Sequence, residues 1–231
     1  MVRPFPAALI GLALAACGSA LSDADCRADA DCAGAAICDG ARCTDPAVLG
    51  TPPLFGSARV VLRPADDAVV ARGVASRALG ATDFLLVGAG RGADAWRSYI
   101  RFDFEALRRA GSITRAELRL RTRTDPPGSS GTPCAVGLYL ARGPWRSSGL
   151  TWENQPGAAG TERAWTVVTG ARETEVRLEV GELVSELVRG VSPNHGFVIR
   201  ARSEQAGARM VAYSSRSPTR RVRPWLEVLH R

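Results

Sequence analysis

The feature that most constrains this chain is the alternation of apolar and polar residues in short segments. Residues 116–121 have the sequence Ala-Glu-Leu-Arg-Leu-Arg, and residues 98–104 alternate in the same way. Successive side chains of a β-strand point to opposite faces, so this period of two predicts strands that are buried on one face. Many such strands separated by turn residues favour an all-β protein, an antiparallel β-sandwich or jelly roll.

The predicted elements fill residues 57–231. Strands are expected at Arg59–Leu62, Phe84–Val87, Trp96–Phe104, Ala116–Leu120, Val136–Leu140, Glu175–Val180, Phe197–Ala201, Met210–Ser214 and Trp225–Leu229. One short helix is expected from Leu183 to Val188, with Gly190 ending it. Pro64–Asp67 is expected to turn, and residues 126–131 and 144–174 are expected to be loops.

The first residues predict export. The uncharged apolar run Phe5–Ala16 is too short to span a membrane and is typical of a signal peptide, here residues 1–16. It ends in Leu-Ala-Ala-Cys17, which resembles the lipobox of bacterial lipoproteins. This resemblance implies cleavage before Cys17 and lipid on its thiol, and the small residues that follow favour the outer membrane or cell surface. An ordinary secreted protein in which Cys17 is incidental is the alternative.

Four of the six cysteines lie close together after this position. Cys26, Cys32, Cys38 and Cys43 are spaced C-x5-C-x5-C-x4-C, and in an exported chain they are expected to form two disulfides of undetermined connectivity. Zinc is the alternative, which the absence of a C-x2-C pair and of a nearby histidine disfavours. The remaining Cys134 is expected to be a buried thiol.

A segment rich in proline and glycine, residues 44–56, is predicted to link the cysteine-rich residues 17–43 to a domain at residues 57–231. Every one of the 30 basic side chains is arginine, and the net charge is +7. This charge would attract anionic polymers, but an exported protein rarely meets nucleic acid. We therefore expect no nucleic-acid partner, and a monomer that its lipid holds at the membrane.

Four motifs follow one another in an order that one family shares. They are Arg101–Phe104 with Ala116–Leu120, Trp145 with Leu150–Pro156, Glu182–Val184 with Asn194–Ile199, and Tyr213–Ser215 with Arg223–Val228. Together they resemble the DNRLRE-domain family, which is related to family 96 carbohydrate-binding modules. This resemblance, over residues 57–230, implies a β-sandwich of cell-surface proteins that binds polysaccharide and performs no chemistry on it.

Aromatic rings are the expected sugar contacts, because the apolar C–H face of a sugar stacks on a ring. Trp96, Tyr99 and Trp165 are the candidates, and Arg101 and Asp103 could contact an acidic sugar from one face of a strand. Each has a structural alternative, in which the rings pack and the two charges pair within the sheet. Three further tryptophans are expected to be structural: Trp145, Trp152 and Trp225.

No catalytic motif accompanies these candidates. An enzyme needs a nucleophile with its base, or two carboxylates across a cleft, and His195 is better explained as a turn residue. Asp66 and Asp67 could help to hold a calcium ion, but the sequence lacks a denser run of acidic ligands beside them. We expect no catalytic residue, no cofactor and no metal.

The sequence therefore predicts a non-catalytic lipoprotein of the outer membrane or cell surface whose β-sandwich binds polysaccharide or another envelope component. A structural or adhesive protein that contacts protein partners is the alternative. A polysaccharide-active hydrolase or lyase is the least favoured interpretation.

Overall fold

A computed structural model of the chain describes residues 26, 37–39, 42–44, 57–80, 82–90, 94–124, 132–169, 172–204 and 207–231. The predicted signal peptide, Cys17, Cys32, residues 45–56 of the predicted linker and the predicted loop at 126–131 lie outside these residues. In the described part of the chain, no helix has the length and apolar character needed to cross a membrane.

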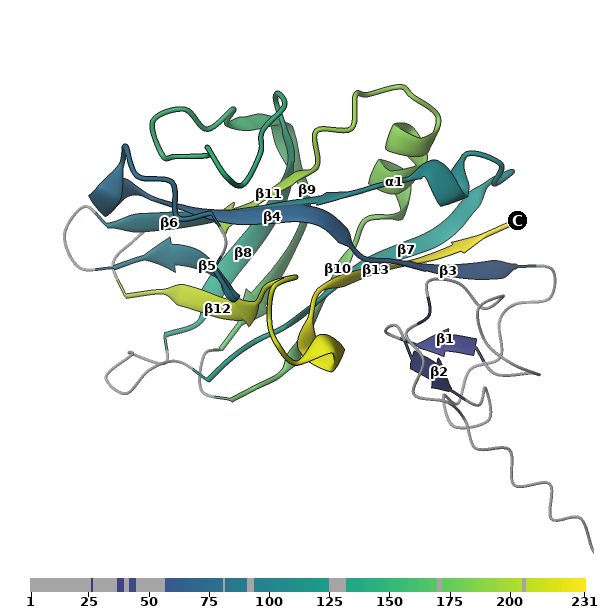
Figure 1. Cartoon of the computed structure of the whole chain (residues 1–231), viewed down its shortest axis with the longest axis horizontal. Coiled ribbons are helices and arrows are strands. Elements are labelled where there is room, and N and C mark those ends of the chain that lie inside the picture. Colours follow the sequence, from purple (N-terminus) through teal and green to yellow (C-terminus); the bar gives the residue numbers. More distant parts are fainter. Residues whose placement is uncertain are drawn as a thin grey trace, which may run out of the picture.

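Two antiparallel sheets form the predicted sandwich (Figure 1). The small sheet has the strand order β10-β7-β13-β3, with β10 at Glu175–Glu179, β7 at Ile113–Arg121, β13 at Trp225–His230 and β3 at Ala58–Leu62. The large sheet has the order β12-β5-β6-β11-β8-β9, and β4 also pairs with β6. Its strands are β4 Pro64–Ala71, β5 Phe84–Ala89, β6 Ala95–Phe102, β8 Cys134–Ala141, β9 Ala158–Val168, β11 Phe197–Ala201 and β12 Arg209–Tyr213.

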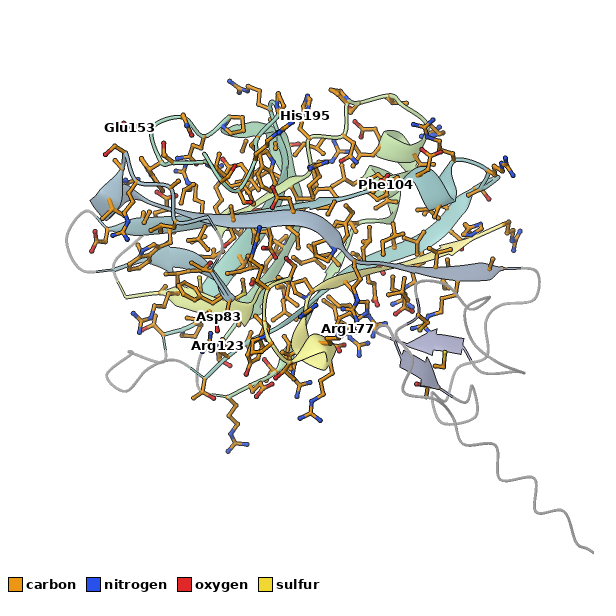
Figure 2. All side chains as sticks on the ribbon, in the orientation of Figure 1. Asp83, Phe104, Arg123, Glu153, Arg177 and His195 are labelled. Atoms are coloured by element: carbon orange, nitrogen blue, oxygen red, sulfur yellow. The ribbon has the colours of Figure 1, made fainter. Side chains whose placement is uncertain are left out.

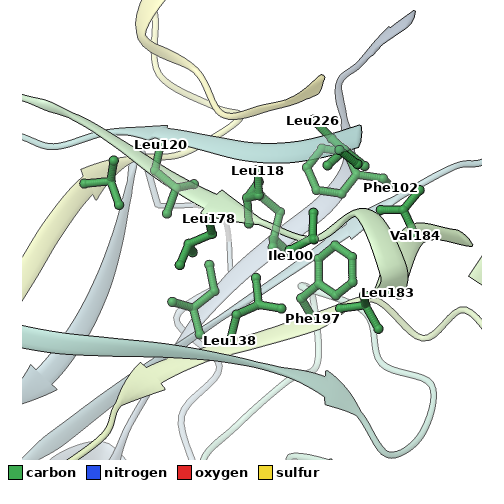
Figure 3. Packing of buried hydrophobic residues seen from close by; sticks show 14 of the residues in the cluster. Ile100, Phe102, Leu118, Leu120, Leu138, Leu178, Leu183, Val184, Phe197 and Leu226 are labelled. Carbon is green, nitrogen blue, oxygen red and sulfur yellow. The ribbon is translucent and has the colours of Figure 1, made fainter. Parts of the chain in front are cut away.

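The main core lies between the two sheets, where the alternation predicted it. Ile100, Leu118, Leu138 and Phe197 are all fully buried in it, one from each of four strands (Figure 3). The predicted helix is α1, Gly181–Val188, and it adds its own apolar side chains to the same core. It stops before Gly190, whose φ of +71° is a left-handed conformation that favours glycine.

The predicted turn at Pro64–Asp67 is wrong. These residues begin β4, and a single residue, Arg63, separates it from β3 of the opposite sheet. The chain thus crosses from one sheet to the other without turning back. Proline is acceptable as the first residue of a strand because its missing N–H interrupts no ladder there. The acidic pair that suggested a turn is instead bound by other side chains, as described below.

The predicted loop at 144–174 is also wrong in part, because it contains β9, Ala158–Val168. This strand pairs only with β8 in the sheet order, so it lies at the edge of the large sheet. Gly160 has a φ of +64°, and the register shifts between Leu138 and Leu140 of the partner strand. The irregularity and the exposed position together hide the period of two from the sequence.

Short strands also form in the cysteine-rich segment. β1, Ile37–Asp39, pairs with β2, Arg42–Thr44, and places Cys38 opposite Cys43. Cys26 and Cys43 are each disulfide-bonded. The connectivity of the four cysteines stays a prediction. Cys134 on β8 is fully buried, as expected.

Candidate functional site

The large sheet is apolar on its outer face as well as toward the core. A second cluster of buried side chains on this face includes Tyr99, Tyr139, Trp145 and Val198, with Trp152 packed against it. Trp145, Leu150 and Trp152 belong to residues 142–157, the connection between β8 and β9, which therefore folds over the sheet. In Figure 2, Glu153 of this connection and His195 both lie along the upper rim of the molecule.

Tyr99 lies beneath this connection. Its ring is fully buried, contacts Trp145 edge to face at a centroid distance of 5.5 Å, and donates its hydroxyl to Gln155 Oε1 at 3.0 Å. Burial raises the pKa of Tyr99 to about 12. Tyr99 was expected to reach a ligand, and this is corrected here, because a ring that is covered by a loop cannot stack on a sugar.

Trp145 and His195 behave as structural residues, as predicted. The indole Nε1 of Trp145 donates to the backbone carbonyl of His195 at 2.7 Å. His195 lies in a turn in which its own backbone N–H donates to Pro193. This turn ends at Gly196, whose φ is +82° and where an added Cβ would come within 2.6 Å of the Ile100 carbonyl oxygen. Glycine is therefore required there, and the turn holds the connection against β6.

Two aspartates hold the covering connection in place. Asp66 Oδ2 accepts the backbone N–H of Ser147 at 2.9 Å, and Asp66 Oδ1 accepts from Arg216 Nη2 at 3.3 Å. Burial raises the pKa of Asp66, but these hydrogen bonds outweigh it and the pKa is lowered. Asp67 is almost fully buried and pairs with Arg216 Nη1 at 3.0 Å, yet burial dominates and raises its pKa. Among the described residues, no group of three His, Cys, Asp or Glu side chains could hold a metal ion.

At one end of the outer face, two guanidinium groups lie against an indole ring. The Cζ atoms of Arg97 and Arg72 lie 4.4 Å and 4.8 Å from the centroid of Trp152. Glu204 accepts from both arginines at 2.8 Å, and Arg97 also reaches Gln155 Oε1 at 3.4 Å. The half-buried Trp152 ring is thus contacted by two arginine side chains where the second cluster reaches the surface.

At the other end, the same combination recurs with a more exposed ring. Trp165 on β9 is 55% exposed, and Arg202 Cζ lies 4.7 Å from its centroid. Glu162 accepts from Arg202 Nε at 3.0 Å and from the Tyr139 hydroxyl at 3.1 Å. Arg200 Cζ lies 4.2 Å from the centroid of Tyr139. Opposite Trp165 on β8 stands Gly137, so no side chain from that position crowds the indole.

We call this surface the aromatic–arginine face, made of Trp152, Arg97, Tyr139, Arg200, Arg202 and Trp165. Guanidinium groups stacked on rings keep their in-plane N–H donors available to hydroxyl or carboxylate oxygens. Rings and donors therefore alternate along one side of the sheet. This is the combination that a sugar chain requires, because its C–H faces need apolar contact and its hydroxyls need polar partners.

The other predicted ligand residues lie elsewhere. Trp96 is half-buried at the start of β6, where its ring would contact any side chain added at Gly90. Arg101 is half-buried beside β4, while Asp103 is exposed and accepts the backbone N–H of Glu105 at 2.9 Å. Although both residues are described, no ion pair joins Arg101 to Asp103, so their expected pairing within the sheet is wrong. Of the five candidates, the structure places Trp165 alone on the aromatic–arginine face.

Sequence reasoning did not propose Arg97, Tyr139, Arg200 or Arg202 as residues of this face, and it expected Trp152 to be structural. Tyr139 lies in a nearly continuous apolar strand, Cys134–Ala141, and looks like core in the sequence. The available signal was Arg200, the one charged residue within the apolar strand Phe197–Ala201. In register, Arg200 stands opposite Gly137 and Val198 opposite Tyr139, which could have placed them on one face had the strand order been known.

The outer face of this β-sandwich thus combines aromatic rings with arginine side chains. The comparison with family models is specific: carbohydrate-binding module family 96 matches residues 58–229, nearly all of the sandwich. The chain belongs to this family. Its sandwich is thus a carbohydrate-binding module by family, as the sequence motifs had implied. No curated protein gave a significant match.

Proposed function

We propose that this protein binds polysaccharide through the aromatic–arginine face and performs no chemistry on it. The observation that carries the proposal is Trp165, a tryptophan that is 55% exposed on a sheet edge and has the Arg202 guanidinium 4.7 Å from its ring centroid. Contiguous exposed apolar side chains mark interaction sites, and Trp165 shares its face of β9 with Val167, which is 53% exposed. The family assignment supports carbohydrate as the contact.

The charges of the face favour an acidic polysaccharide over a neutral one. Arg97 and Arg202 are balanced by Glu204 and Glu162, but Arg200 has no carboxylate partner among the described residues. A sugar carboxylate near Arg200 would supply that partner in a charge-assisted hydrogen bond. The net charge of +7 would add a long-range attraction for an anionic chain.

We further propose that the protein acts at the outer membrane or cell surface, anchored by lipid on Cys17. The support is the apolar run Phe5–Ala16 and the lipobox-like Leu-Ala-Ala-Cys17. Radiolabelled fatty acid should be incorporated into the wild type and not into Cys17→Ala. Label in the variant would overturn the anchor without affecting the binding proposal.

The binding test is affinity electrophoresis of the mature chain, residues 17–231 with Cys17→Ala, in gels that contain acidic or neutral polysaccharides. The migration of the wild-type protein should be retarded, most strongly by an acidic polymer. Trp165→Ala should weaken binding by about tenfold or more, as expected for an aromatic anchor. Arg200→Ala should weaken binding to acidic polymers selectively.

Two variants serve as matched controls. Val191→Ala removes an exposed apolar side chain that follows α1 and is not part of the aromatic–arginine face, and Arg177→Ala removes an exposed arginine from the small sheet. Both should bind as the wild type does. Retardation by none of the polymers would overturn the proposal, as would equal retardation of Trp165→Ala and Val191→Ala.

A further inference from the structure

Most outward-facing residues of the small sheet are charged, but apolar side chains interrupt this face on two neighbouring strands, β3 and β13. Val61 of β3 and Trp225 of β13 are outward-facing, since Val60, Leu62 and Leu226 point into the main core. Their neighbours on this face are charged residues such as Arg59, Glu227 and Arg119. Despite their outward position, Val61 is fully buried and Trp225 is 7% exposed.

The cysteine-rich segment covers these two side chains. Cys26 is 1% exposed and forms a separate apolar cluster with Val61 and Trp225, and Cys43 packs against that cluster. Both cysteines are disulfide-bonded. Figure 1 shows the β1–β2 hairpin beside β3, on the side of the small sheet. Val61 and Trp225, two apolar side chains on the outer face of the small sheet, therefore form a contact surface for the cysteine-rich segment.

This contact and the aromatic–arginine face lie on opposite sides of the sandwich. The first belongs to the outer face of the small sheet, and the second to the outer face of the large sheet. Figure 2 shows the two sides, with Glu153 of the covering connection at the top and Arg177 of the small sheet below, near the hairpin.

We propose that the docked, disulfide-bonded segment orients the module, so that the aromatic–arginine face points away from the membrane. The proposal rests on the proposed function for the lipid and for the binding face. Cys26 lies nine positions after Cys17, which limits the lipid to about 30 Å from the docking point. The sequence predicted a linker rich in proline and glycine at residues 44–56, but no contact between the cysteine-rich segment and the module. A docked segment instead keeps the small sheet nearest to the membrane.

Docking is tested first, without membrane or sugar. Val61→Lys places a charge under Cys26, while Val191→Lys makes the same substitution at a site that is 67% exposed. Under non-reducing conditions, trypsin should cleave within residues 17–44 of Val61→Lys at least about tenfold faster than in the wild type or Val191→Lys. Equal cleavage rates in all three proteins would overturn docking. Gel retardation of Val61→Lys by polysaccharide should be retained, which shows that the sandwich still folds.

Orientation is tested on lipidated protein in vesicles that contain an acceptor-labelled lipid. Donor dyes are attached at Arg177→Cys, on the small sheet, or at Val167→Cys, on β9 next to the aromatic–arginine face; Cys134 is buried and does not compete. Energy transfer should be stronger from position 177 than from 167, and Val61→Lys should reduce the difference. Equal transfer from both positions in the wild type would overturn the orientation. Failure of the proposed function is distinguished by other measurements. The wild type would then show no retardation by polysaccharide, or it would incorporate no lipid label.

Discussion

The two outer faces of the sandwich use arginine in different ways. On the small sheet, arginines pair with glutamates in a continuous network, in which Arg119 contacts Glu117, Glu175 and Glu227 at 2.8–3.4 Å. On the large sheet, Arg97, Arg200 and Arg202 lie over aromatic rings at 4.2–4.7 Å from their centroids. The first arrangement pairs its charges within the network, whereas the second includes Arg200, which has no carboxylate partner among the described residues. The difference suggests that one face stabilises the fold and the other binds.

The largest expected effect tests the stabilising face. Glu117 is 5% exposed and pairs with Arg115 at 2.6 Å and with Arg119 at 2.9 Å. Glu117→Ala should lower the free energy of unfolding in urea by about 3 kcal/mol, because it leaves a largely buried arginine with fewer counter-charges. Glu162→Ala, on the other face, should cost less than half as much. Equal losses for the two variants would contradict the division of roles, and Glu117→Ala should keep its affinity for polysaccharide.

The second prediction concerns the buried floor of the large sheet at alkaline pH. The unfolded chain loses the Tyr99 proton near pH 10, whereas the folded chain holds it to about pH 12 because the ring is buried. The contribution of Tyr99 to stability is therefore complete below pH 10 and declines between pH 10 and 12. Two pKa units correspond to roughly 3 kcal/mol. Urea unfolding at pH 9 and pH 12 should show a smaller loss in Tyr99→Phe than in the wild type, and an identical loss would show that Tyr99 is accessible.

The third prediction concerns Trp165, whose removal should weaken binding strongly but lower the stability of the fold only slightly. Trp165→Ala should change the free energy of unfolding by less than about 1 kcal/mol, because more than half of the side chain is already exposed. Thermal unfolding of the same preparation that is used for affinity electrophoresis measures both properties. A loss of several kcal/mol would mean that the ring supports the fold and that its effect on binding is indirect.

The smallest effect lies at the rim of the charged network. Arg121 and Glu173 form a pair at 3.1 Å, with side chains 42% and 39% exposed. Arg121→Ala should alter the free energy of unfolding by no more than about 0.5 kcal/mol, since exposed pairs are weakened by solvent and by the entropy of the side chains. Chemical denaturation in low and high salt is the measurement. A cost equal to that of Glu117→Ala would show that burial does not set the strength of this network.

Strands were predicted correctly both where alternation is regular and where a short apolar run is bounded by turn residues, as at Phe84–Val87. β7 is the clearest case of alternation, because Leu118 and Leu120 are fully buried while Glu117 and Arg119 face outward and pair. The errors fall where partners distant in the sequence decide the structure. In the sequence, Asp67 has the character of a turn residue. In the structure it lies in a strand because Arg216, from near the other end of the chain, pairs with it. Likewise, the sequence of β9 is typical of a loop, and only its pairing with β8 makes it a strand.

The sequence by itself determined the fold class, the inward faces of the main strands and the family, because these depend on short-range periodicity and on ordered motifs. It also offered Trp165 as a candidate ligand contact, which stays a prediction. Only the tertiary structure decided that Tyr99 is buried and Trp165 exposed, although both are aromatic residues on the outer face of one sheet. The physical reason is that residues 142–157 cover one part of that face and leave the other open. In the same way, the cysteine-rich segment covers Val61 and Trp225 through a contact that no local pattern encodes.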